Sequence, residues 1–243
     1  MKLSGNKILI TGGATGIGFG LAERFIKEGN SVVICGRRKD MLESAEEKLP
    51  GISTIQADLS SYESREALFN RIRMDHRDTN VLINNAGIQQ WMAITDENFI
   101  QNAKDELAIN VEAPVHLTHL FLKHEPLTTI MNVTSGLAFS PLAKTPVYCG
   151  TKAFLRSFTL SLRYLLKEKD IEVIELIPPA LNTDLGGKGI HDFAPPVSGF
   201  IESVFEQLSA GKDEIAYQFS EAMLNAGPEE RNAAFEKMNP FQK

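Results

Sequence analysis

Tyr148 and Lys152 lie four residues apart in a segment with helical periodicity, so both side chains project from one face of the expected helix. A phenol can donate or accept a proton, and a nearby ammonium group favours its ionised form. The pair therefore predicts an acid-base site for a molecule bound at this face. The spacing is equally compatible with an ordinary amphipathic helix, in which the tyrosine packs and the lysine stem covers apolar surface.

A glycine-rich turn near the start of the chain predicts a second kind of site. Residues 11–18 read Thr-Gly-Gly-Ala-Thr-Gly-Ile-Gly, between a short apolar run at 7–11 and a helical pattern. Glycines let the main chain turn tightly and approach a phosphate, while free amides and the positive end of the helix dipole face its charge. We expect a dinucleotide at this turn; the alternative is a tight turn that binds nothing.

Strand and helix patterns alternate along the chain and must position these residues. We expect strands at 7–11, 31–35, 53–57, 81–84, 129–134 and 171–177. We expect helices at 16–28, 40–48, 62–74, 96–123, 146–167 and 197–208, the fourth bent or interrupted near Pro114 because proline lacks an N–H. The alternation predicts an α/β fold of Rossmann type, with a doubly wound, mostly parallel sheet in a three-layer sandwich.

The chain after the sixth expected strand is patterned less clearly. Residues 182–196 are rich in Gly and Pro and predict a loop, which together with the next helix forms a substrate loop and lid over about 182–210. The C-terminal segment, 213–243, predicts one strand-like piece and one helix. No linker separates it from the rest, so we expect residues 1–243 to form a single domain.

Composition excludes several classes of function. A formal net charge of −6 argues against a nucleic-acid partner. Two cysteines, Cys35 and Cys149, are too few for a disulfide framework, and no apolar run is long enough for a signal peptide or a membrane span, so we expect a cytoplasmic protein without membrane insertion. His116, His119 and His124 lack companion carboxylates or thiols, so no metal site is expected.

Residues 84–87 (Asn-Asn-Ala-Gly) follow the fourth expected strand, and with the glycine turn and Tyr148-x-x-x-Lys152 they resemble the short-chain dehydrogenase/reductase family over about residues 5–185. The resemblance implies an NAD(P)-dependent oxidoreductase that moves a hydride between nicotinamide and the carbonyl or secondary alcohol of a small organic substrate. It also implies a homodimer, through the long helices, or a homotetramer. The alternative is a catalytically silent cofactor-binding sensor or scaffold with the same fold, which usually has a damaged catalytic set.

The resemblance assigns catalytic roles to four residues. Tyr148 is the expected acid/base, and Lys152 lowers its pKa and binds the nicotinamide ribose. Ser135 ends the fifth expected strand, where its hydroxyl is placed to hold the substrate oxygen, although serine before glycine is also a common turn residue. Asn110 matches the family asparagine that holds a water in a proton relay with the lysine.

Two positive charges after the second expected strand favour NADP as the cofactor, with NAD also possible. Gly36 stands where NAD enzymes of this fold usually carry an acidic residue, and Arg37 and Arg38 follow with guanidinium groups suited to a 2′-phosphate. The alternative is that both arginines are solvated charges opening a helix. Thr15 differs from the basic residue that many NADP-preferring relatives carry nearby. Asp58 matches the family aspartate at the adenine ring, or it is a helix N-cap.

Two further segments border the expected cofactor and substrate. Pro178 and Thr183 match the family loop at the nicotinamide carboxamide, although Pro179 replaces a common glycine. Trp91 and Met92 follow the fourth strand and are equally compatible with lining a substrate pocket or with plain packing. The expected cofactor contacts are Gly12, Thr15, Gly16, Ile17, Gly18, Arg37, Arg38, Asp58, Leu59, Asn85, Ala86, Gly87, Tyr148, Lys152, Pro178 and Thr183.

Overall fold

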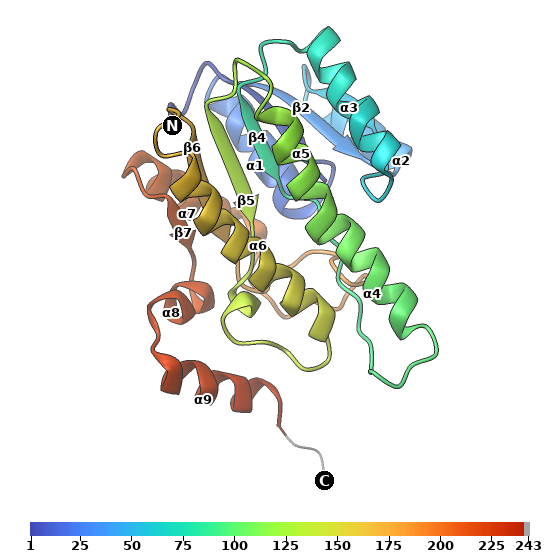
Figure 1. The fold of residues 1–243 in the computed structure, drawn as a ribbon, viewed down its shortest axis with the longest axis vertical. Coiled ribbons are helices and arrows are strands. Elements are labelled where there is room, and N and C mark those ends of the chain that lie inside the picture. Colours follow the sequence, from blue (N-terminus) through green and yellow to red (C-terminus); the bar gives the residue numbers. More distant parts are fainter. Residues whose placement is uncertain (241–243) are drawn as a thin grey trace.

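Seven short, mostly apolar runs pair as one parallel sheet in the structure, a computed structural model that describes residues 1–240 (Figure 1). The strands are β1 (Lys7–Thr11), β2 (Ser31–Gly36), β3 (Ser53–Gln56), β4 (Val81–Asn84), β5 (Thr129–Val133), β6 (Glu172–Ile177) and β7 (Glu214–Ala216). Their order across the sheet is β3-β2-β1-β4-β5-β6-β7, and each neighbouring pair is parallel. Successive strands are added toward one edge of the sheet from β1 to β3 and toward the other edge from β4 to β7. This is the doubly wound arrangement that the sequence predicts.

Helices cover both faces of this sheet (Figure 1). They are α1 (Gly16–Lys27), α2 (Lys39–Lys48), α3 (Tyr62–Asp75), α4 (Phe99–Leu107), α5 (Ala113–Phe121), α6 (Pro146–Leu165), α7 (Val197–Ser209), α8 (Phe219–Asn225) and α9 (Pro228–Met238). One core packs α1, α2 and α7 on one face, and a second packs α3, α5 and α6 on the other. No helix within residues 1–240 is long and apolar enough to cross a membrane.

The single helix expected over 96–123 is wrong in detail. The structure divides it into α4, a π-helical turn (Ala108–Glu112) and α5, and α4 begins at Phe99. In the π turn the Ala113 N–H donates to the Ala108 carbonyl, five residues back. Pro114 has no N–H to offer the Asn110 carbonyl four residues earlier, which explains why the α-helical pattern fails there. The interruption expected near Pro114 is therefore present, and Asn110 lies inside it.

The C-terminal segment also differs from the sequence prediction. The strand ends at Ala216, and two helices, α8 and α9, replace the one expected. Gly227 and Pro228 explain the break, because proline is favoured in the first turn of a helix and disfavours helical geometry in the residue before it. In Figure 1, α8 and α9 extend away from the sheet toward the C-terminus. Residues 241–243 of the predicted C-terminal segment lie outside the described residues.

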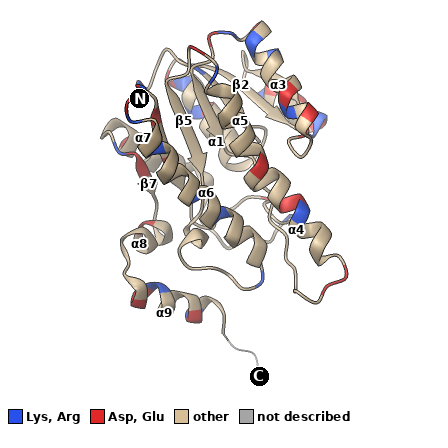
Figure 2. Ribbon diagram, viewed as in Figure 1, with Lys and Arg blue, Asp and Glu red and all other residues tan. Residues whose placement is uncertain are grey.

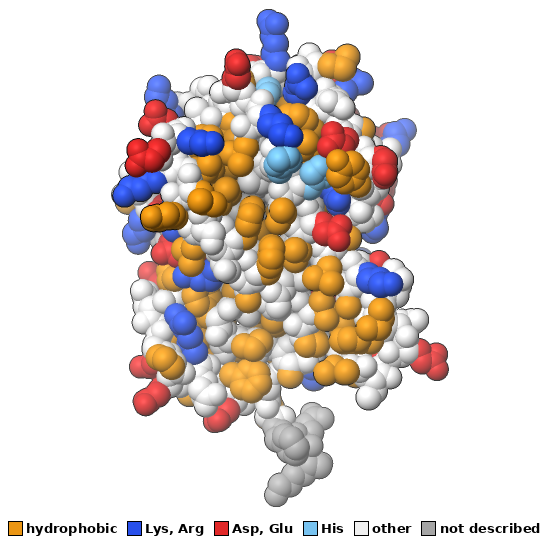
Figure 3. Space-filling view, viewed as in Figure 1, with side chains coloured by type: hydrophobic (Ala, Val, Ile, Leu, Met, Phe, Trp, Pro, Cys, Tyr) orange, Lys and Arg blue, Asp and Glu red, His pale blue; other side chains and the backbone are white. Residues whose placement is uncertain are grey.

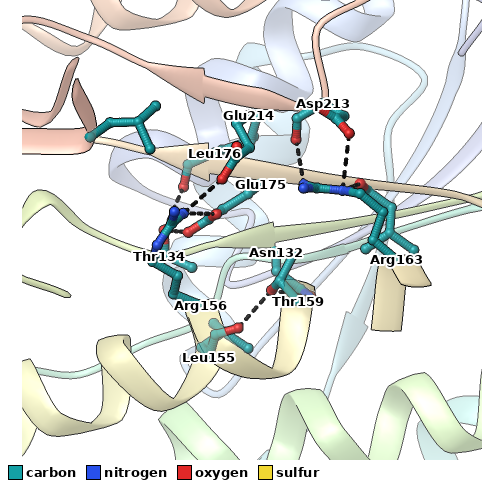
Figure 4. Close-up of polar contacts among 12 residues, drawn as sticks. Asn132, Thr134, Leu155, Arg156, Thr159, Arg163, Glu175, Leu176, Asp213 and Glu214 are labelled. Carbon is teal, nitrogen blue, oxygen red and sulfur yellow. Dashed lines mark hydrogen bonds and ion pairs between the residues drawn. The ribbon is translucent and has the colours of Figure 1, made fainter. Parts of the chain in front are cut away.

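A buried ion pair fastens α6 to the last two strands (Figure 4). Arg156 on α6 donates to Glu175 Oε2 on β6 at 2.5 Å and to Glu214 Oε1 on β7 at 2.9 Å. Glu175 is fully buried, and its other oxygen accepts from Thr134 Oγ1 at 2.7 Å. Burial raises the pKa of Glu175, which the Thr134 hydrogen bond and the Arg156 charge oppose. Arg156 is therefore one anchor of α6 on the sheet, and Arg163, which donates to the Asp213 carbonyl at 2.8 Å, is another (Figure 4).

Removing the Arg156 side chain should destabilise the fold strongly. Arg156→Ala leaves the Glu175 charge buried without its cation, so we expect the free energy of unfolding at pH 7 to fall by about 3–5 kcal/mol. Urea denaturation followed by circular dichroism measures this loss. In a Glu175→Gln background no buried charge is left without a partner, so the same change should lower the free energy of unfolding by only about 1–2 kcal/mol. Equal costs in the two backgrounds would contradict the assignment.

Candidate active site

Hydrogen bonds between the ends of β1 and β4 fix the glycine turn. The Thr11 hydroxyl oxygen accepts the N–H groups of Asn85 and Ala86, both at 3.0 Å. In return, Asn85 Nδ2 donates to the carbonyls of Thr11 at 2.8 Å and Gly12 at 3.1 Å. The Asn-Asn-Ala-Gly segment therefore stabilises the main-chain conformation at the start of the glycine turn.

The glycine turn itself has no room for side chains. A Cβ on Gly18 would lie 2.4 Å from the Gly12 carbonyl oxygen, and Gly12 and Gly16 have φ values of +63° and +55°. Thr15 is exposed at the N-cap of α1, and its side chain accepts no hydrogen bond from the first turn within the described chain. The amide end of α1 thus faces the turn, which fits a dinucleotide pyrophosphate.

Arg37 and Asp58 lie together beyond the ends of β2 and β3. Arg37 is exposed, and its charge contributes to lowering the pKa of Asp58, for which the largest cause is the Ser60 hydroxyl hydrogen bond. Asp58 Oδ1 accepts from Ser60 N at 3.0 Å and Ser60 Oγ at 2.7 Å. Asp58 is not the helix N-cap, because Ser61 caps α3 by accepting the Ser64 N–H. Arg38 occupies the N-cap of α2.

Of the other expected cofactor contacts, Thr183 and Pro178 lie near the carboxyl ends of the strands, and Leu59 lies in the core. Thr183 meets the start of α1, since a Cβ on Gly16 would lie 3.3 Å from Thr183 Cγ2. The Pro178 carbonyl accepts the Gly136 N–H at 3.1 Å, which ties the end of β6 to the residue after Ser135. Leu59 is buried in the core against α3 and α5, so its side chain faces away from a ligand.

Tyr148 and Lys152 are both buried on α6, with 5% and 4% of their surfaces exposed. Lys152 Nζ donates to the Val133 carbonyl at 2.8 Å and lies 5.6 Å from the centre of the Tyr148 ring. Burial lowers the pKa of Lys152 to about 8. Burial also raises the pKa of Tyr148, which a hydrogen bond with the Ser135 side chain opposes. The direction is opposite to the lowering expected from Lys152, because desolvation of the phenolate dominates.

Asn110 uses its side-chain amide to hold the loop after β4. Its Oδ1 accepts the Ile88 N–H at 2.9 Å, and its Nδ2 donates to the Ile88 carbonyl at 2.8 Å and to Thr151 Oγ1 at 3.1 Å. A Cβ on Gly87 would lie 3.4 Å from Asn110 Oδ1 and 3.6 Å from Lys152 Nζ. Asn110 and Lys152 therefore lie together around Gly87, while the water relay stays a prediction.

Glu106 is a site residue that the sequence reasoning missed. It lies on α4 one turn before Asn110, is fully buried, and its Oε1 accepts the Gln90 N–H at 2.6 Å. Burial raises the pKa of Glu106 to about 7. A signal was present, because Glu106 shares a helical face with Asn110 and Leu117, which places a carboxylate among residues expected to be buried.

The C-terminal helices hold the loop that joins Ser135 to Tyr148, and this too was missed. Asn239 Oδ1 accepts the Ala143 N–H at 2.7 Å, and Asn239 Nδ2 donates to the Pro141 carbonyl at 3.0 Å. Phe139 in the same loop lies beneath two guanidinium groups, Arg156 at 4.4 Å and Arg231 at 5.1 Å from the ring centre. These partners lie far away in the sequence, so no local pattern reveals them.

An open, mainly apolar groove lies between the loop after β4 and the loop before α6. Its volume is about 370 Å³, and it is lined by Trp91, Met92, Ala93, Asp96, Ala143 and Lys144. Trp91 also approaches the predicted substrate loop, with its Nε1 3.4 Å from a Cβ placed on Gly186. Trp91 and Met92 thus line a groove, and their contact with a substrate stays a prediction.

Comparisons with known proteins identify relatives over most of the chain. A family model described as short chain dehydrogenase matches residues 6–192. The chain is 41% identical over 250 residues to the uncharacterized oxidoreductase DltE of Bacillus subtilis, covering 98% of each chain. It is 32% identical over 180 residues to serine 3-dehydrogenase of Agrobacterium fabrum, covering 73% of this chain and 72% of that protein.

Solved structures share the fold. A short-chain dehydrogenase from Sphingobium yanoikuyae in complex with NADPH superposes with a TM-score of 0.81 at 24% identity, covering 98% of both chains. One from Burkholderia cenocepacia in complex with NADP gives a TM-score of 0.84 at 22% identity, covering 98% of this chain and 99% of that chain. The predicted Rossmann-type α/β fold is thereby confirmed.

Loss of the Asn239 side chain should loosen the loop between Ser135 and Tyr148. Asn239→Ala removes two hydrogen bonds to residues 141–143, so we expect amide hydrogen exchange there to become about fivefold faster, equivalent to roughly 1 kcal/mol. Exchange in β1 and α1 should stay unchanged. Asn232→Ala is the matched control, because Asn232 is exposed on α9 and bonds Glu236 of the same helix. Identical exchange in both variants would contradict the role of Asn239.

Proposed function

The chain belongs to the short-chain dehydrogenase family, and we propose that it is an NADP-preferring oxidoreductase acting on a carbonyl or secondary alcohol of a small organic substrate. The observation that carries this proposal is the convergence of Ser135, Tyr148, Lys152 and Asn110 beside the glycine turn. All four catalytic residues expected from the sequence are intact, which favours an enzyme over a silent scaffold.

In the proposed reaction, Tyr148 exchanges a proton with the substrate oxygen. The bound nicotinamide supplies or accepts the hydride. During reduction the Tyr148 hydroxyl gives its proton to the substrate oxygen, and during alcohol oxidation the phenolate takes it back. The Ser135 hydroxyl, whose interaction with Tyr148 opposes the rise in the pKa of that phenol, orients the same oxygen and stabilises its developing charge.

Lys152 supplies the positive charge that stabilises a buried Tyr148 phenolate at this position. Burial alone disfavours the Tyr148 phenolate, so a nearby positive charge must compensate for it. The pKa of Lys152 is lowered to about 8, so at pH 7 its ammonium form predominates. Above pH 8 the lysine loses this charge, and its support of the phenolate is lost with it.

The cofactor preference rests on the end of β2. Arg37 and Arg38 are both exposed immediately after Gly36, where an adenosine 2′-phosphate would lie if the dinucleotide crosses the glycine turn in the usual direction. The related structures include complexes with NADPH, NADP and, in a 3-ketoacyl-(acyl-carrier-protein) reductase from Brucella melitensis, NADH. We therefore propose NADP(H), with NAD(H) as the weaker alternative.

The homo-oligomer expected from the resemblance stays a prediction. The α6 face opposite the sheet exposes Phe154, Leu160, Tyr164 and Leu165. Apolar side chains gather over the α5 and α6 face in Figure 3, and Figure 2 shows few charges along α6 compared with α3. An association of two copies through the long helices would cover this face. The cytoplasmic location likewise stays a prediction.

Tyr148→Phe tests the mechanism directly. We expect wild-type protein to oxidise NADPH with members of a carbonyl panel that includes 3-oxo acids, since serine 3-dehydrogenase and an NADP-dependent 3-hydroxy acid dehydrogenase are among the relatives. The variant should lose at least about 100-fold in kcat, because it lacks the proton donor. NADPH binding, followed by fluorescence titration, should be retained. Equal activity in both proteins would refute the role of Tyr148.

Arg37→Ala tests the cofactor preference. Loss of a charged hydrogen bond to the 2′-phosphate should raise the Kd for NADPH by about 10- to 100-fold, or roughly 1.5–3 kcal/mol, and leave NADH binding unchanged. Lys39→Ala is the control, because Lys39 is an exposed neighbour that pairs with Glu43 on its own helix. Wild-type protein that binds NADPH and NADH equally would contradict the preference.

A further inference from the structure

Glu106 lies level with Tyr148 in the packing of α4 against α6. The two helices run side by side in the same direction (Figure 1). Asn110 contacts α6 through a hydrogen bond from its Nδ2 to Thr151 Oγ1, and Thr151 neighbours Lys152. One turn earlier on each helix are Glu106 and Tyr148. Their proximity is also visible in the electrostatics, because the Glu106 charge contributes to raising the pKa of Tyr148.

Glu106 also holds the loop that follows Gly87. Its Oε1 accepts the Gln90 N–H at 2.6 Å, and the Gln90 side chain donates to the Asn102 carbonyl on α4 at 3.3 Å. The neighbouring Gln89 is buried and borders the substrate loop, with its carbonyl oxygen 3.5 Å from a Cβ on Gly186. Glu106 therefore fixes the main chain at a point between α4 and the expected substrate side of the site.

The second carboxyl oxygen of Glu106 is buried, and it has no hydrogen-bond partner within residues 1–240. Tyr148, Cys149 and Lys152 are the titratable groups on the facing turns of α6, and residues 88–92 contribute none. Lys152 directs its Nζ to the Val133 carbonyl. A charged Glu106 would thus lack a paired cation, and a protonated one would fit the site better.

We propose that Glu106 is a proton-controlled positioning residue: protonated, it holds the loop at 88–92 without opposing a Tyr148 phenolate, and ionised, it opposes that phenolate. This inference rests on the proposed function, because the phenolate forms only when Tyr148 gives its proton to a substrate. Asn110 holds the same loop one turn later through a neutral amide, so only Glu106 adds a charge that changes with pH.

The consequence is a loss of carbonyl reduction as pH rises through about 7. Below pH 7, Glu106 is neutral, because burial raises its pKa to about 7. Above pH 7, its negative charge disfavours the phenolate that Tyr148 becomes on donating its proton. This step precedes the deprotonation of Lys152, whose pKa is lowered to about 8.

The decisive variant is Glu106→Gln, which keeps an acceptor for the Gln90 N–H and removes the charge. We expect kcat for reduction in wild-type protein to fall by about fivefold between pH 6 and 7.7, which is the fall in the protonated fraction of a group whose pKa is about 7. In the variant the fall should have its midpoint near pH 8, where Lys152 loses its charge. Asp105→Asn, a neighbouring carboxylate on a more open face of α4, is the matched control and should keep the wild-type profile.

A second measurement needs no substrate, so its failure is distinguishable from failure of the proposed function. The folded-state pKa of Glu106 lies above that of an unfolded glutamate, so the ionisation penalty is absent below pH 4.5 and complete above pH 7. The Tm of Glu106→Gln relative to wild type should therefore rise steadily from pH 4.5 to 7.5. A constant difference in Tm, or rate profiles of the two proteins that coincide, overturns the proposal.

Discussion

The parallel direction of the strands is the constraint on which the whole site depends. When strands run the same way, their carboxyl ends meet at one edge of the sheet, and the order β1, β4, β5 brings three of these ends side by side. The residues at or just beyond successive strand ends are Gly12, Arg37, Asp58, Asn85, Ser135 and Pro178. A short chain segment at each end then needs only local hydrogen bonds, such as those between Thr11 and Asn85, to acquire its final shape.

Within that edge, the site gathers polar groups that water no longer reaches. Tyr148, Lys152 and Glu106 are all buried. Burial raises the pKa of Tyr148 and Glu106 and lowers the pKa of Lys152, so in each case it favours the neutral form. Lys152 has a main-chain carbonyl as partner and Tyr148 has Ser135, whereas Glu106 has a partner for one oxygen within residues 1–240. Such clustering of displaced pKa values is typical of sites that move protons. By contrast, Glu175 is paired with Arg156 and serves to anchor α6.

Local pattern was sufficient to predict the first six strands, the glycine turn and the Tyr148–Lys152 pair, because their residue types respond to near neighbours. Pro114 signalled the interruption, but it could not show that Asn110, inside the interruption, would bond Ile88, 22 residues away. The break at Pro228 was readable from the proline and was missed. Glu106 shares a helical face with Asn110 and Leu117, but its complete burial arises only when α4 meets α6 and the loop after β4.

The loop between Ser135 and Tyr148 is held by two different parts of the chain. Its two ends carry the residues proposed for the proton chemistry and lie within the part of the chain that matches the family model, residues 6–192. Its middle is held by Asn239 and Arg231, which lie beyond that match. Ser135 follows β5 and Tyr148 lies on α6, so their positions depend on elements within that match. The C-terminal segment instead holds residues 141–143, directly beside the groove that Ala143 and Lys144 help to line.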